Sequence, residues 1–60
     1  MIEKLLRLPD VEEITGLKRS TIYLMVKNRE FPRPVRLTKR ASAWRHSEIQ
    51  SWIDNREVAL

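Results

Sequence analysis

Residues 9–28 read PDVEEITGLKRSTIYLMVKN, two helical patterns that are separated by the only glycine in the chain. Pro9 suits the start of a helix over residues 8–15, because a first-turn amide has no partner within the helix. Gly16 can adopt the positive φ that often ends a helix, so we expect the first helix to stop there. Three acidic residues suit the positive end of its dipole: Asp10, Glu12 and Glu13.

A second helix is predicted from Lys18 or Arg19 to about Asn28, because the segment Phe31-Pro32-Arg33-Pro34 cannot continue a helix. Its inner side is expected to carry Ile22, Met25, Val26 and Arg29, and its outer side Ser20, Tyr23, Leu24 and Lys27. Two short helices joined by a tight turn form a helix-turn-helix, in which the first helix supports the second. The N-terminal end of the second helix can then enter the major groove of DNA.

A β-hairpin is expected after this pair of helices. Val35-Arg36-Leu37 alternates apolar and charged residues, as a half-buried strand does, and Ala41-Ser42-Ala43-Trp44 can return beside it. The polar tip, Thr38-Lys39-Arg40, has no Gly or Asn, so the sequence does not define its turn type. The hairpin has the form of a wing that contacts flanking DNA.

The C-terminal part predicts a third helix, from Ser47 to about Arg56. Ser47-Glu48-Ile49-Gln50 is a capping-box pattern, and Ile49, Trp52 and Ile53 form an apolar stripe. The sequence therefore predicts one mainly α domain over residues 1–60, a small winged helix-turn-helix with three helices and a two-stranded hairpin.

The composition narrows the range of functions. The chain has 60 residues, one His and no Cys, which argues against disulfides, Cys-based zinc sites and His-rich metal sites. Apolar runs are far shorter than the roughly 20 residues of a membrane span, and the first residues do not resemble a signal peptide. We expect a cytoplasmic protein without a metal or cofactor. Since no catalytic motif is recognisable, we do not expect an enzyme.

Charge is distributed unevenly along the chain. Residues 16–45 contain nine Lys or Arg and one acidic residue, a net charge of +8, whereas residues 1–15 and 46–60 each carry −2. This pattern is compatible with a binding surface for a polyanion or with a solvated basic face. The helix-turn-helix pattern favours double-stranded DNA as the partner.

Candidate DNA-binding residues follow from this arrangement. Arg19, Ser20 and Thr21 are expected to contact bases or nearby phosphates, and Tyr23 to contact a phosphate or a thymine methyl group. The alternative is that these residues, and the charged residues of the hairpin tip, are exposed to solvent without binding DNA. The complete candidate set is Lys18, Arg19, Ser20, Thr21, Tyr23, Lys27, Arg36, Lys39 and Arg40.

The aromatic residues and the histidine have less specific roles. Trp44 and Trp52 are candidates for stacking against single-stranded bases, but their positions favour a structural role in the core. His46 is expected to be an exposed residue at the helix start.

Four stretches resemble the AlpA family of small prophage regulators, which is close to phage excisionases and MerR-like winged helix domains. They span about residues 5–54 and comprise Leu6-Arg7-Leu8-Pro9-Asp10-Val11, Thr15-Gly16-Leu17-Lys18-Arg19-Ser20-Thr21-Ile22-Tyr23, Phe31-Pro32-Arg33-Pro34-Val35-Arg36-Leu37, and Trp44-Arg45 with Ser47-Glu48-Ile49 and Trp52-Ile53. The resemblance implies a winged helix-turn-helix protein that activates integrase or excisionase genes. Alternatives are an excisionase that bends attachment-site DNA, and a protein-interaction module such as an anti-repressor. Further partners to consider are a second copy on DNA, integrase and RNA polymerase.

The sequence departs from the family pattern at three places. Lys18 stands where Ser is frequent, so the second helix lacks its usual side-chain cap. Thr38-Lys39-Arg40 stands where the wing often has Gly, and Leu24 where a basic residue is common.

Overall fold

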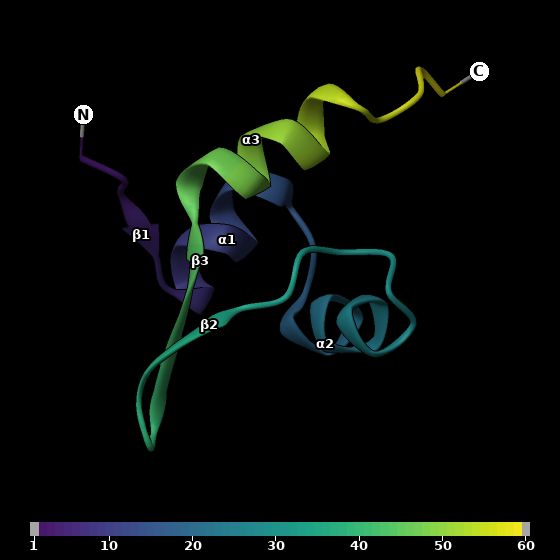
Figure 1. The fold of residues 1–60 in the computed structure, drawn as a ribbon. Helices are drawn as coiled ribbons and strands as arrows, with labels where there is room; N and C mark the ends of the chain where they lie inside the picture. Colours follow the sequence, from purple (N-terminus) through teal and green to yellow (C-terminus); the bar gives the residue numbers. More distant parts are fainter. Residues whose placement is uncertain (1, 60) are drawn as a thin grey trace.

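The computed structural model describes residues 2–59, within which three helices and three short strands are present (Figure 1). The elements follow one another as β1 (Leu5–Leu6), α1 (Leu8–Thr15), α2 (Arg19–Lys27), β2 (Val35–Thr38), β3 (Ala41–Arg45) and α3 (His46–Asp54). The predicted helix-turn-helix and hairpin are confirmed, and the architecture is that of a small winged helix fold.

The strands form an antiparallel sheet in the order β1-β3-β2, so β3 lies in the middle. Beyond the predicted hairpin, the sheet contains β1, in which Leu6 is paired with Trp44. A strand of two residues is too short to show a periodic pattern, which is why the sequence did not predict it. Arg36 pairs with Ser42 and Thr38 with Ala41, so the pairing of β2 with β3 is irregular between Arg36 and Thr38, close to the hairpin tip.

The ends of α1 follow local signals. The backbone amide of Arg7 donates to the Asp10 carboxylate at 3.2 Å, and Pro9 lies in the first turn. Gly16 has a φ of 74°, and its amide donates to the Glu12 carbonyl at 2.8 Å. Of the three acidic residues expected at the start of α1, only Asp10 lies in its first turn.

The end of α2 is a Schellman motif that contains an arginine in the left-handed region. The amide of Arg29 donates to the Val26 carbonyl at 3.1 Å, and the amide of Glu30 to the Met25 carbonyl at 2.7 Å. Arg29 has a φ of 60°, a position that usually belongs to glycine. Its expected place on the inner side of the helix is therefore wrong, because Arg29 lies beyond α2 and is exposed.

The predicted capping box at the start of α3 does not form. The helix begins at His46, one residue early, and its N-cap is Arg45. The Ser47 hydroxyl donates to the Glu3 carboxylate, and the Gln50 amide donates to Asp54 Oδ1 at 3.1 Å. The pairing of β1 with β3 brings Glu3 close to Ser47, which leaves Ser47 bonded to another segment of the chain.

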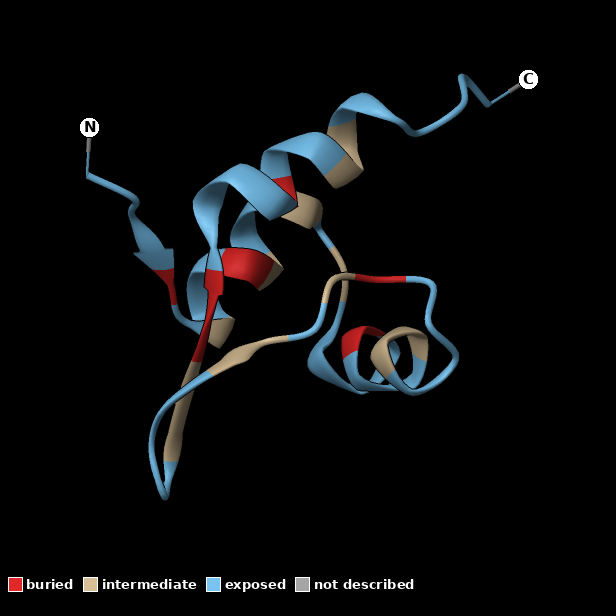
Figure 2. Ribbon diagram, viewed as in Figure 1, coloured by how far each residue is buried: buried red, intermediate tan, exposed pale blue. Residues whose placement is uncertain are grey.

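The core collects one or two residues from nearly every element and is shown by the red segments in Figure 2. Trp44 is 1% exposed, and its indole Nε1–H donates to the Pro32 carbonyl at 2.8 Å. Trp52 is half-buried at the edge, with its ring 4.7 Å from that of Phe31. Both tryptophans therefore have the structural role that the sequence favoured. The buried cluster consists of Leu6, Val11, Ile22, Phe31, Trp44 and Ile49.

Replacing Trp44 by Phe is expected to destabilise the protein by about 2–3 kcal/mol, because a cavity forms and the Pro32 carbonyl loses its donor. Chemical denaturation followed by circular dichroism measures the loss. The matched control is Trp52→Phe, which should cost at most about 1 kcal/mol because the Glu30 carbonyl that it releases is exposed. Equal losses in the two variants would contradict the central role of Trp44.

Replacing Arg29 by Gly is expected to stabilise the protein by about 0.5–1 kcal/mol, because a left-handed φ costs a residue with a Cβ about 1–2 kcal/mol and glycine recovers part of this. The melting temperature should rise by several degrees. Arg33→Gly removes the same charge from an exposed residue without a positive φ, and should not stabilise the protein. A rise of the same size in both variants would rule out the backbone explanation.

Candidate nucleic-acid interface

The outer side of α2 presents the side chains that the sequence singled out. Ile22 is fully buried and Met25 and Val26 are half-buried, which fixes the rotation of the helix about its axis. The opposite side consequently faces solvent. The predicted outer residues Ser20, Tyr23, Leu24 and Lys27 are exposed there. The candidates Arg19 and Thr21 are exposed in the first turn, as is Lys18 just before the helix.

The start of α2 is capped from another helix. Lys18 is the N-cap, and its side chain makes no capping hydrogen bond, as its replacement of Ser implied. The backbone amide of Arg19 donates instead to Glu12 Oε2 at 3.1 Å, and the Arg19 Nη2 lies 3.3 Å from Glu12 Oε1. Glu12 therefore compensates the dipole of α2 rather than that of α1.

Sequence reasoning missed this role of Glu12. Two signals were present in the chain: a helix start without a capping side chain, and acidic residues on the preceding helix across a tight turn. Neither signal identifies which acid of α1 faces α2.

The hairpin forms a second basic surface. Arg36, Lys39 and Arg40 are all exposed, and they line a shallow hollow at the tip with Thr38 and Ser42. The backbone amide of Arg40 donates to the Thr38 hydroxyl at 3.2 Å. This side-chain hydrogen bond stabilises the tip without the glycine that the family often has there.

The two basic surfaces lie at separate places in the fold. Figure 1 shows the tip of the β2–β3 hairpin at the lower left of the view and α2 at the lower right. The loop between α2 and β2 connects them, and the hydrogen bond from Trp44 to Pro32 ties this loop to β3.

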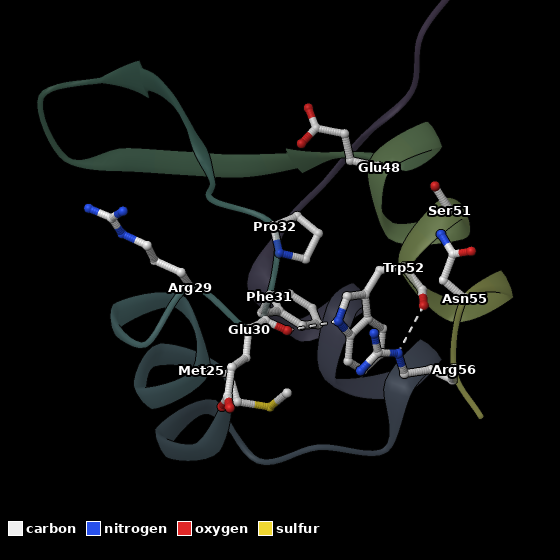
Figure 3. Close-up of a pocket in the computed structure, with 10 residues that line it drawn as sticks. All are labelled: Met25, Arg29, Glu30, Phe31, Pro32, Glu48, Ser51, Trp52, Asn55 and Arg56. Atoms are coloured by element: carbon white, nitrogen blue, oxygen red, sulfur yellow. Dashed lines mark hydrogen bonds between the residues drawn. The ribbon is translucent and has the colours of Figure 1, made fainter. Parts of the chain in front are cut away.

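A groove lies between the end of α2 and α3, and its side chains bond to one another (Figure 3). The indole of Trp52 donates to the Glu30 carbonyl at 2.9 Å, and the Arg56 guanidinium lies 4.5 Å from the centre of the Trp52 ring. The Arg56 Nε–H also donates to the Trp52 carbonyl at 3.2 Å. The bond from Trp52 to Glu30 fastens the turn after α2 to α3, and the contacts of Arg56 hold the end of α3 against Trp52.

The part of the chain from residue 2 to residue 59 contains no cluster of three or more His, Asp or Glu side chains placed to hold a metal ion. His46 is exposed in the first turn of α3. None of the helices within these residues has the length and apolar character required to cross a membrane.

Comparison with known proteins gives a family. The model described as "Prophage CP4-57 regulatory protein (AlpA)" matches residues 4–57, which includes the whole fold described above. The chain belongs to the AlpA family of prophage regulatory proteins. The resemblance identified over residues 5–54 is thereby confirmed.

A curated relative comes from a bacteriophage. The uncharacterized protein ORF88 of Enterobacteria phage P4 is 44% identical over 54 residues, which are 90% of the present chain. The chain spans 61% of the length of that relative. No solved structure matched this AlpA-family chain.

Proposed function

We propose that this AlpA-family chain is a regulatory protein that binds double-stranded DNA in a sequence-specific manner. The observation that supports it is the exposed first turn of α2, where Arg19, Ser20 and Thr21 project from a helix held by the buried Ile22. One winged helix-turn-helix unit would place this end of α2 in the major groove.

Roles are divided between side chains by their chemistry. Arg19 has a guanidinium fork that suits the acceptors of a guanine edge, and the hydroxyls of Ser20 and Thr21 bond to bases or phosphates. Tyr23 is 51% exposed, so both its ring and its hydroxyl are accessible for a thymine methyl group or a phosphate.

The cationic side chains supply affinity that does not depend on sequence. Lys18 and Lys27 lie at the two ends of α2, and Arg36, Lys39 and Arg40 lie on the hairpin. With α2 in the groove, the hairpin would contact the flanking backbone or minor groove. Figure 1 shows α2 and the hairpin tip at different places in the fold, so the two groups of cations would contact different parts of one duplex.

The regulatory role proposed is activation of an integrase or excisionase gene. A single DNA-binding module covers only about 600–1,000 Å² of protein surface, so specific binding is expected to involve a second copy on the DNA. A permutation gel-shift with promoter and attachment-site fragments tests this role. Strong bending confined to attachment-site DNA would assign the protein to excision instead.

Binding is expected to weaken steeply with salt. If about five phosphates are neutralised by the five cations of α2 and the hairpin, a plot of log K against log salt has a slope near −4 to −5. Fluorescence anisotropy of a labelled duplex at increasing NaCl concentrations measures it. Lys4→Ala serves as the control, because Lys4 is exposed on the segment beside α3 and its loss should leave the slope unchanged. A flat salt response disproves the electrostatic contribution.

Two single substitutions should separate sequence reading from electrostatic attraction. Arg19→Ala is expected to cost about 1–3 kcal/mol of binding and to relax sequence preference, because a base contact is lost. Lys39→Ala should weaken binding to all sequences alike and reduce the salt slope by about one. Selection from a randomised duplex pool, followed by titration, gives both quantities. Equal preference in wild type and Arg19→Ala would remove Arg19 from the base-reading residues.

A further inference from the structure

The carboxylate of Glu12 binds one residue of α2 at two points. One oxygen accepts from the backbone amide of Arg19, and the other contacts the guanidinium of the same residue. The Glu12 side chain is 25% exposed and that of Arg19 is 65% exposed. The contact therefore restrains Arg19 without covering it.

The position of this carboxylate matters for phosphate binding. A helix N-terminus attracts anions because its first amides have no partner within the helix and its dipole is positive there. At the start of α2 the amide of Arg19 is already bonded to Glu12, and the negative charge of Glu12 repels a phosphate. One of the amides that could bind the DNA backbone is thus taken by an acid of the protein itself, and the charge of that acid lies beside the remaining ones.

The effect on Arg19 differs for the two kinds of DNA acceptor. A guanidinium has five N–H donors, and the contact with Glu12 engages Nη2, leaving other donors on an exposed side chain. The acceptor atoms of a base edge are neutral, so the charge of Glu12 opposes their approach far less than that of a phosphate. A restrained side chain also loses less conformational entropy when it binds a base.

We propose that Glu12 is a positioning residue that determines specificity: by binding both the amide and the guanidinium of Arg19, it directs Arg19 to base edges rather than to phosphates. This inference rests on the DNA binding proposed above. It assigns a role in sequence reading to a residue outside the recognition helix.

The test compares Glu12→Gln with Glu13→Gln. Both remove one negative charge from α1, but Glu13 is exposed and belongs to neither contact with Arg19. Dissociation constants are measured for a duplex that the wild-type protein selects from a randomised pool, and for the unselected pool, at several NaCl concentrations. The ratio of the two constants is the specificity.

Glu12→Gln is expected to lower the specificity about three- to tenfold, part of the discrimination that one arginine–base contact provides. Binding to the unselected pool should tighten, and its log–log salt slope should steepen by about one, because one more phosphate is bound. Glu13→Gln should change both dissociation constants by the same factor. An unchanged specificity in Glu12→Gln, or an equal loss in Glu13→Gln, overturns the proposal.

A double-mutant cycle examines whether the effect passes through Arg19. In an Arg19→Ala background, Glu12→Gln should leave the specificity unchanged, because the side chain that Glu12 directs is absent. A loss of the same size in both backgrounds contradicts positioning. In the same Arg19→Ala background, Glu12→Gln should still tighten binding to the unselected pool, because the negative charge of Glu12 repels phosphates whether or not Arg19 is present.

If wild type neither selects a duplex nor responds to salt, DNA binding fails and the inference falls with it. If wild type selects a duplex and Glu12→Gln retains the specificity, only the role of Glu12 fails.

Discussion

The buried indole of Trp44 connects the parts of this small fold. Trp44 lies on the central strand, β3, and its Nε1–H bonds to the carbonyl of Pro32, just beyond the turn that ends α2. The same strand pairs with β1 and with the wing strand β2. A chain of 60 residues buries only about 60% of the surface that it exposes when unfolded, so a few contacts carry much of its stability. This one ties α2, the hairpin and the N-terminal segment together.

The start of α2 combines features that are unfavourable for an isolated helix. Lys18 and Arg19 place positive charge near the positive end of the helix dipole, and no acidic residue lies in the first turn. Glu12 offsets this from the neighbouring helix through an exposed contact, of a kind that contributes only about 0.2–1 kcal/mol. Residues that are unfavourable for local structure are expected at functional sites. Positive charge at the start of α2 agrees with a surface that binds a polyanion.

Much of the fold and of the candidate surface could be predicted because the deciding signals act over a few residues. Pro9 and Gly16 lie at the two ends of α1, and both α1 and α2 lie within one residue of their predicted bounds. The spacing of Ile22, Met25 and Val26 identified the inner side of α2, and therefore the outer candidates. Arg29 was misplaced because a periodic pattern cannot reveal that the helix has ended and that the backbone has become left-handed.

The sequence by itself determined the three helices, the hairpin, the basic middle segment and the exposed side of α2, since periodicity, proline, glycine and charge are local properties. Only the tertiary structure decided that β1 joins β3, that Ser47 bonds to Glu3, and that Glu12 caps α2. Each of these contacts joins segments whose approach depends on how the core packs. Such contacts produce no periodic pattern in the sequence, because the partner of a polar side chain depends on the tertiary structure and not on the neighbouring residues in the chain.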